Sequence, residues 1–124
     1  MGGQLILIRH GIAEERTPEG DDFYRKLTEA GVEEMTAFLP DIAPLLTEDG
    51  NLKIWTSPLL RARETAELVA EATAVEEIQP QEFLATGDFV AFMDALKQED
   101  EGFNLALVGH EPDMSSWTKE LIGA

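Results

Sequence analysis

Short apolar runs alternate with amphipathic stretches along this chain, and no other feature of the sequence constrains the fold as much. Gln4–Ile8 is an almost continuous apolar run, as expected of a strand that is buried on both faces. Leu52–Thr56 and Asn104–Val108 have the same character. Such runs, separated by helical segments, predict an α/β domain with a mainly parallel sheet. We expect residues 1–124 to form one domain, because 124 residues leave little room for two.

Helical patterns occupy the segments between these runs. Thr28 can cap a helix whose apolar side chains fall on one face, and Pro40 is expected to kink or end that helix. Ser57 followed by Pro58 predicts another helix start, because Pro is favoured at the first helical position. Two further helices are expected to begin at Asp88 and at Asp113. Residues 14–22 and residues 76–87 are rich in Pro, Gly or acidic residues and are predicted to be loops.

The chain is strongly acidic, with 9 Lys and Arg against 25 Asp and Glu and a net charge of −16. A protein with this charge repels nucleic-acid backbones and anionic lipid headgroups, so we expect neither as a partner. The sequence has no Cys, which excludes disulfides and thiolate metal sites. The first apolar run stops at Arg9 and is too short for a signal peptide or a membrane span. A soluble, cytoplasmic protein is therefore expected.

Both histidines and two of the arginines lie where the predicted strands end. The first run leads into Arg9, His10 and Gly11, the third leads into His110, and Arg61 lies in the first turn of the helix after the second. Ligands of parallel α/β sheets bind at the carboxyl ends of the strands. In a protein of net charge −16, two arginines and both histidines gathered at one edge are hard to explain as surface decoration.

These residue types suit phosphoryl chemistry. The neutral imidazole of His10 can attack phosphorus, and neighbouring cations depress its pKa and keep it neutral near pH 7. Guanidinium groups bind phosphate oxygens through paired, charge-assisted hydrogen bonds. The helix that begins near Ser57 adds a dipole that favours an anion, and Gly11 permits a close approach of the backbone to a ligand. The pattern predicts a phosphoryl-binding pocket.

Each of these residues also has a plainer interpretation. A histidine at a strand end, such as His110, is more often structural than catalytic. Arg61 can be a solvated helix residue or can pair with a carboxylate on its own helix. Arg9 can cap its strand against an acidic loop, and Gly11 can be a turn glycine. Only their expected convergence favours a shared site.

The three strand ends together resemble the signatures of the histidine phosphatase superfamily. Leu7–Gly11 resembles its Arg-His-Gly motif, Ser57–Ala66 is similar to Ser-Pro-x-x-Arg-Ala-x-x-Thr, and Val108–Pro112 is similar to Gly-His-x-Pro. Asp22–Gly31 resembles the Asp-x-x-Arg-x-Leu-Thr-x-x-Gly segment of the SixA-type phosphohistidine phosphatases. The likeness spans residues 4–122, which is nearly the whole chain.

The resemblance implies a three-layer, phosphoglycerate mutase-like fold with helices on both faces of the sheet. It implies that His10 is the nucleophile and forms a transient phosphohistidine. Arg9, Arg61 and His110 would clamp the phosphoryl oxygens, Arg25 would assist, and neither a metal nor another cofactor is implied. The substrate implied for this type is phosphohistidine in a signalling or phosphorelay protein.

The chain departs from the family pattern in two places. Larger members protonate the leaving group with an acidic residue between the second and third motifs, and Glu82 is the candidate here, although the labile P–N bond of phosphohistidine demands little acid help. Members of this type also continue past the last helix with more strand. We therefore expect that a chain ending at Ala124 leaves a sheet edge unpaired, and that an oligomer contact covers the edge or stability is reduced.

Three functions remain open from the sequence. The first is a metal-independent phosphatase that acts on a phosphohistidine-containing protein. The second is a phosphatase for a small phosphoester, such as a sugar or metabolite phosphate, which would need a committed general acid. The third is a phosphate-binding module without turnover. In each case the partner is a phosphorylated protein or small molecule.

Overall fold

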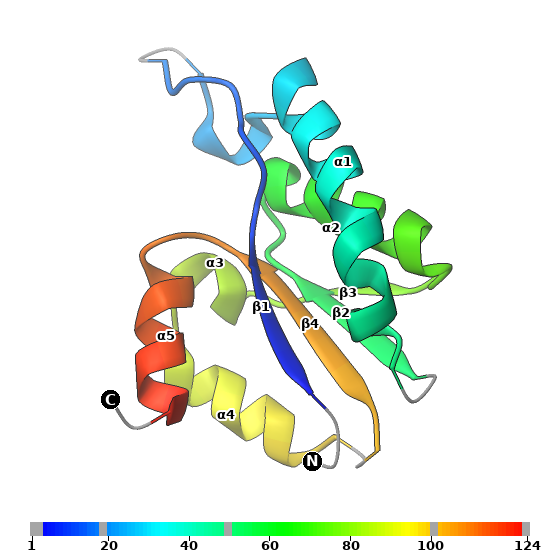
Figure 1. Ribbon diagram of the computed structural model, residues 1–124. Coiled ribbons are helices and arrows are strands. Elements are labelled where there is room, and N and C mark those ends of the chain that lie inside the picture. The colour runs from blue at the N-terminus through cyan, green and yellow to red at the C-terminus, as the bar shows by residue number, and fades with distance from the viewer. Residues whose placement is uncertain (1–3, 18–19, 49–50, 100–101, 123–124) are drawn as a thin grey trace.

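Four parallel strands form one sheet in the order β1-β4-β2-β3 (Figure 1). The computed structural model describes residues 4–17, 20–48, 51–99 and 102–122. The strands are β1 (Leu5–Arg9), β2 (Leu52–Thr56), β3 (Ile78–Pro80) and β4 (Asn104–Gly109). Because all four run in the same direction, their carboxyl ends meet at one edge of the sheet.

Helices cover both faces of this sheet, which confirms the predicted α/β class and its three layers. One 3₁₀ turn and five helices are described: η1 (Asp22–Tyr24), α1 (Glu29–Leu46), α2 (Leu60–Thr73), α3 (Phe83–Thr86), α4 (Phe89–Lys97) and α5 (Asp113–Ile122). Helices α1 and α2 lie on one face, and α3, α4 and α5 lie on the other (Figure 1). None of the described helices combines the length and the apolar character that crossing a membrane requires.

The two faces have different cores. The face under α1 and α2 is mainly aliphatic and includes Leu39, Ile54 and Val69, whereas the other face holds an aromatic cluster. In that cluster the rings of Phe92 and Trp117 stack with centroids 5.0 Å apart. Burial of each such side chain contributes about 1.5–3 kcal/mol, so both faces hold the central strands in place.

Three of the four predicted helix starts are confirmed and one is wrong; α5 begins at Asp113 as expected. Thr28 caps α1 by accepting a hydrogen bond from the backbone N–H of Gly31, and Asp88 caps α4 in the same way. Ser57 does not begin α2, which starts three residues later at Leu60. The Ser57 hydroxyl accepts a hydrogen bond from the backbone N–H of Leu59 and lies 2.8 Å from Nε2 of His110.

Helix α1 continues through two prolines. Pro40 is predicted to kink or end the helix; an end there is wrong, because α1 runs past Pro40 and Pro44 to Leu46, and a kink stays a prediction. Each proline removes one backbone donor, but Leu39 and Leu46 are buried on the sheet and hold the helix on both sides of Pro40.

The stretch 76–87 is not a simple loop. It contains β3 and α3, and β3 pairs with β2 through residues such as Ile78 and Gln79. A strand of three residues is too short to show a periodic pattern in the sequence, which explains why it was missed. Pro80 is tolerated because β3 lies at the edge of the described sheet.

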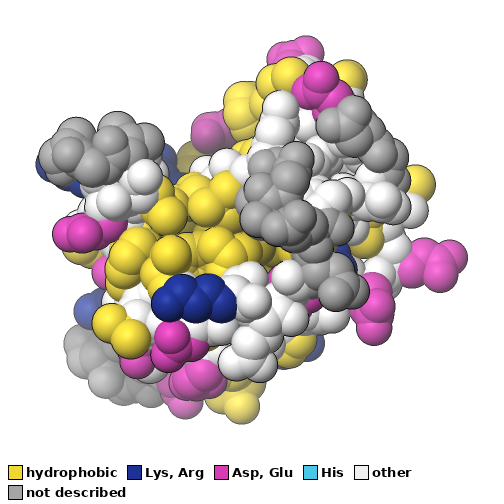
Figure 2. Space-filling view, turned by 90° about the horizontal axis from the view of Figure 1, so that it is seen from below, with side chains coloured by type: hydrophobic (Ala, Val, Ile, Leu, Met, Phe, Trp, Pro, Cys, Tyr) yellow, Lys and Arg dark blue, Asp and Glu magenta, His cyan; other side chains and the backbone are white. Residues whose placement is uncertain are grey.

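Within the described residues, β1 pairs with β4 alone, and a groove of about 920 Å³ runs beside it. Ile6 and Ile8 line one wall of the groove, and Phe38, Ile42 and Leu45 of α1 line the other. Hydrophobic side chains also gather around a hollow on the face seen in Figure 2, with acidic side chains at its margin. The residue at the end of the sequence, Ala124, lies outside the described residues, so the expectation about the chain end stays a prediction.

Candidate active site

The carboxyl ends of β1, β2 and β4 place three side chains together. The parallel register sets Arg9 opposite Gly109, so that His10 and His110 follow at the same level. The backbone N–H of His10 donates to the carbonyl of Gly109 at 3.0 Å, and that of Ser57 donates to Val108 at 2.9 Å. The two imidazole rings lie with their centroids 5.1 Å apart. The structure thus brings both histidines together at the sheet edge.

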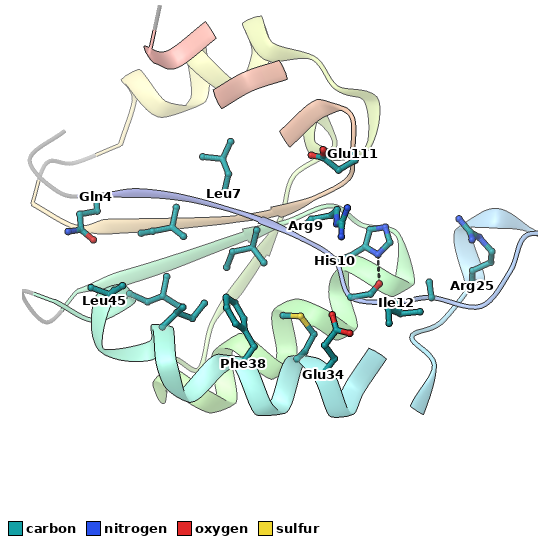
Figure 3. Close-up of a pocket in the computed structure, with 17 residues that line it drawn as sticks. Gln4, Leu7, Arg9, His10, Ile12, Arg25, Glu34, Phe38, Leu45 and Glu111 are labelled. Carbon is teal, nitrogen blue, oxygen red and sulfur yellow. Dashed lines mark hydrogen bonds between the residues drawn. The ribbon is translucent and has the colours of Figure 1, made fainter. Parts of the chain in front are cut away.

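His10 has a defined tautomer. Its Nδ1 atom lies 2.7 Å from the carbonyl oxygen of Gly11, drawn as a dashed line in Figure 3. A carbonyl only accepts hydrogen bonds, so Nδ1 carries the hydrogen and Nε2 keeps its lone pair. Burial lowers the pKa of His10 below 6.5, and the charges of Arg61, Arg25 and Arg9 lower it further, although the bond to Gly11 acts in the opposite direction. Near pH 7 the ring is neutral and Nε2 can attack an electrophile.

His110 is buried beside it. Burial lowers the pKa of His110 to about 4, and the neighbouring His10 and Arg61 add to this shift, so the ring is neutral at pH 7. Its Nε2 atom lies 2.8 Å from the hydroxyl of Ser57. Since that hydroxyl accepts a bond from Leu59, it can give its own hydrogen to Nε2 and leave Nδ1 protonated. The buried Nδ1 has no partner among the described residues and supplies a donor next to His10.

Arg61 is buried and does not pair with a carboxylate of its own helix. Its side chain is only 6% exposed, which contradicts the interpretation as a solvated helix residue. One terminal nitrogen donates to the carbonyl of Asp22 at 2.9 Å, and the other lies 3.3 Å from the Asp22 carboxylate. The Nε atom of Arg61 is buried and has no partner within the described part of the chain. The site therefore contains a second unused donor.

Thr65 connects the first strand end to α2. Its hydroxyl donates to the carbonyl of Arg61 at 2.8 Å and accepts from the backbone N–H of Gly11 at 3.1 Å. A Cβ atom on Gly11 would lie 2.9 Å from Cγ of Met35. Glycine therefore allows a close approach to Met35 of α1 at this position, and the close approach of a ligand stays a prediction.

Two further arginines line the groove that holds His10. Arg9 is exposed, and it lines the same groove as His10 and Arg25 (Figure 3). Arg25 follows η1, and its Nε donates to Asp22 at 2.7 Å while a terminal nitrogen donates to the carbonyl of Glu14 at 2.8 Å. The groove therefore combines a neutral imidazole with cationic donors at the end where the strands stop.

No hydrogen bond or ion pair between described residues joins the Glu82 side chain to this group. It is exposed at the N-cap position of α3, makes no capping hydrogen bond through its side chain, and does not line the groove that holds His10. The carboxylates that line the groove are Glu34 and Glu111. A role for Glu82 as general acid stays a prediction.

Asp22 and Thr65 contact the predicted site residues but were given no role from the sequence. Both lie inside the segments that carry the family resemblance, and Asp22 stands three residues before Arg25. A search for the carboxylate that compensates the clustered arginines could have found Asp22. Among the described residues, no group of three or more His, Asp or Glu side chains is placed to hold a metal ion.

Comparison with known proteins shows two similarities in sequence. The model of the histidine phosphatase superfamily (branch 1) matches residues 5–102. An uncharacterised protein of Picosynechococcus sp. is 35% identical over 123 residues, a match that covers 95% of this chain and 72% of that protein.

Three of the solved structures that share the fold illustrate the similarity. A protein of Agrobacterium tumefaciens, assigned as the phosphohistidine phosphatase SixA, is 25% identical with a TM-score of 0.84, and the match covers 99% of this chain and 79% of that one. A protein histidine phosphatase SixA in complex with tungstate is 24% identical with a TM-score of 0.78, and the match covers 95% of this chain and 76% of that one. A mycobacterial glucosyl-3-phosphoglycerate phosphatase is 18% identical with a TM-score of 0.69, and the match covers 97% of this chain and 79% of that one.

Proposed function

Because this chain belongs to the histidine phosphatase superfamily (branch 1) and is a phosphatase, we propose that it hydrolyses phosphohistidine on a cytoplasmic signalling or phosphorelay protein. The observation that carries this proposal is the hydrogen bond between Nδ1 of His10 and the carbonyl of Gly11. It leaves Nε2 as a lone-pair donor beside two buried, unused N–H groups on Arg61 and His110.

The proposed reaction has two steps. In the first, Nε2 of His10 attacks phosphorus, the P–N bond of the substrate breaks, and its electron pair returns to the substrate imidazole, which takes a proton from solvent. In the second, water attacks the phosphorus of phospho-His10, the Nε2–P bond breaks, and inorganic phosphate leaves. Nε2 recovers its lone pair, and the proton of the water passes to phosphate or solvent.

The cationic donors stabilise the phosphoryl group as it moves. Phosphoryl transfer spreads negative charge over three oxygens, and preorganised donors in a site with little water stabilise that charge. Arg61, His110 and Arg9 supply N–H groups for it. The start of α2 contributes the positive end of its helix dipole, because Arg61 is its second residue.

Leaving-group chemistry favours phosphohistidine over a phosphoester. An alkoxide leaving group needs a proton donor, whereas the imidazole of phosphohistidine departs with little help. Glu82 lies outside the groove. The carboxylate of Glu111 accepts hydrogen bonds from both the backbone and the hydroxyl of Ser115, so it is held as an acceptor.

The test is intact-mass analysis after brief mixing with a phosphohistidine-bearing protein, comparing wild type with His10→Ala. We expect an acid-labile adduct of one phosphoryl group on the wild type only, followed by release of phosphate. An adduct on both proteins would place the nucleophile elsewhere. Phosphate left on the donor by both proteins would overturn the proposal.

A small phosphoester is the second candidate, favoured by the volume of the groove. The groove of about 920 Å³ lies within the range of small-molecule sites and is lined by Arg9, His10 and Arg25, although neither Arg61 nor His110 lines it. Glu111, which does line it, would have to give up its hydrogen bonds from Ser115 and take a proton to act as the acid. Turnover of sugar phosphates should then exceed that of phosphohistidine and should fall in Glu111→Gln. Equal turnover of sugar phosphates by wild type and Glu111→Gln would remove Glu111 from this role.

A further inference from the structure

We propose that Asp22 is a positioning residue that holds Arg61 and Arg25 in the orientation required for phosphoryl transfer. The proposal rests on the proposed function of the site. An ionised carboxylate close to a phosphoryl-binding site repels the anionic substrate. The proposed role explains why Asp22 stands there.

The contacts of Asp22 carry the proposal. One carboxylate oxygen accepts from Nε of Arg25 at 2.7 Å and lies 3.3 Å from Nε of Arg16. The other lies 3.3 Å from a terminal nitrogen of Arg61, and the backbone carbonyl of Asp22 accepts from the remaining terminal nitrogen at 2.9 Å. Asp22 therefore binds both ends of the Arg61 guanidinium at once, a contact across 39 residues of sequence.

These bonds select which donors of Arg61 remain free. A guanidinium has five N–H groups, and the two that bind Asp22 leave three. One of these is the buried Nε, which has no partner among the described residues. Because the guanidinium is planar and rigid, fixing its terminal nitrogens also fixes the direction of Nε.

The segment that carries Asp22 is anchored to α2 at a second point. The backbone N–H of Leu27 donates to the carboxylate of Glu64 at 2.8 Å, and Glu64 lies three residues after Arg61. Asp21 caps η1 by accepting from the N–H of Phe23 at 2.9 Å. The position of Asp22 is therefore defined by the turn itself as well as by its ion pairs.

Asp22 is held in its ionised form. Its partial burial raises the pKa, but the hydrogen bond from Arg25 and the charges of Arg61, Arg25 and Arg16 outweigh this effect and hold the pKa below 3.8. A carboxylate that stays ionised at neutral pH is a poor proton donor, which excludes Asp22 as general acid. It acts through the arginines that it orients.

Loss of this carboxylate has two opposite electrostatic consequences. It makes the site more positive, which favours binding of phosphate in the ground state. It also frees Arg61 and Arg25 to move, which weakens stabilisation of the transition state, where a displacement of about 1 Å can cost about 100-fold in rate. A positioning role therefore predicts that kcat falls while phosphate binding is unchanged or tighter.

The experiment compares Asp22→Asn with the matched control Asp21→Asn. Both variants lose one negative charge in the same turn, but Asp21 contacts none of these arginines and its amide oxygen can still cap the turn. We expect kcat to fall about 10- to 100-fold in Asp22→Asn, with the dissociation constant of inorganic phosphate unchanged or lower. Asp21→Asn should behave as wild type.

Two outcomes would overturn the proposal. The first is a kcat for Asp22→Asn equal to that of Asp21→Asn. The second is a lower kcat in Asp22→Asn accompanied by weaker phosphate binding and a lower melting temperature than in Asp21→Asn. NMR of the arginine Nε–H groups tests positioning without turnover, because the Arg25 and Arg61 signals should move and broaden in Asp22→Asn but not in Asp21→Asn. If wild type transfers no phosphoryl group, the proposed function fails, while phosphate binding and NMR still decide the role of Asp22.

Discussion

The site has two halves that are held by different forces. His10, Ser57 and His110 follow directly from parallel strands, and their backbones continue the hydrogen bonding of the sheet. Asp22 and Arg25 lie on the segment around η1 and are held by ion pairs between side chains that are 39% and 21% exposed. The strand-borne half supplies the nucleophile, whereas the loop-borne half orients charge. Ion pairs at this exposure are weakened by salt, so the loop-borne half should respond more strongly to ionic strength than the strand-borne half.

The largest effect is expected from replacing the nucleophile in the strand-borne half. His10→Asn keeps an N–H donor for the carbonyl of Gly11 but has no nucleophilic nitrogen, so the rate of dephosphorylation should fall about 10⁴-fold or more. Rapid-quench kinetics measure the rate, and thermal unfolding checks that the fold is retained. A loss below tenfold in a folded variant would show that His10 is not the nucleophile.

Arg61 and Arg25 both bind Asp22 but differ in burial, because Arg61 is buried on α2 next to the strand-borne half and Arg25 belongs to the loop-borne half. Arg61→Ala should lower kcat/KM about 10²- to 10³-fold, in line with removal of a donor to transition-state charge. Arg25→Ala should cost about tenfold, and added salt should narrow its difference from wild type. Arg61→Lys should recover little, since a lysine cannot bind Asp22 at two points. Equal losses for the two alanine variants would contradict the division into halves.

A smaller effect is expected when the pH is lowered. An ordinary imidazole of pKa 6.5 loses about nine-tenths of its neutral form between pH 7.5 and 5.5, whereas His10 has a lowered pKa and should keep more of its activity. A pH–rate profile, corrected for spontaneous hydrolysis, measures this. A tenfold fall over that range would mean that the pKa of His10 is not lowered.

The stability of the fold should also depend on pH, through the lowered pKa of His110. The pKa of His110 is about 4 in the folded protein and about 6.5 in the unfolded chain, so below pH 6.5 the unfolded state binds more protons. The free energy of unfolding should therefore decrease as pH falls from 6.5 to 4, by at most about 1.4 kcal/mol per pH unit for this group. Urea unfolding of wild type and His110→Gln measures the difference.

The smallest effect is expected from Glu82→Gln. Because this carboxylate is exposed and lies outside the groove, turnover of phosphohistidine should change less than twofold. The same variant assayed on a phosphoester tests the general-acid prediction. A large loss there alone would give Glu82 the role of general acid for phosphoesters.

The strand-borne half could be predicted from the sequence, because parallel pairing leaves few alternatives. Three buried apolar runs that pair in register must end at one edge, so Arg9, His10 and His110 have to meet there. The residue types then indicate phosphoryl chemistry. The predicted start of α2, at Pro58, differs from the observed start by two residues because the Ser57 hydroxyl faces His110, and a propensity for helix starts does not include such a contact.

The sequence alone determined the α/β class, the parallel sheet and the edge at which the histidines converge, since hydrophobic periodicity is a local property of the chain and strands that alternate with helices favour parallel pairing. Only the tertiary structure decided the tautomer of His10, the burial of Arg61, the exposure of Glu82 and the contact between Asp22 and Arg61. These features depend on how helices and loops pack above the sheet edge. Hydrogen bonds between side chains distant in sequence have no periodic signature, and their geometry is set when the surrounding elements are in place.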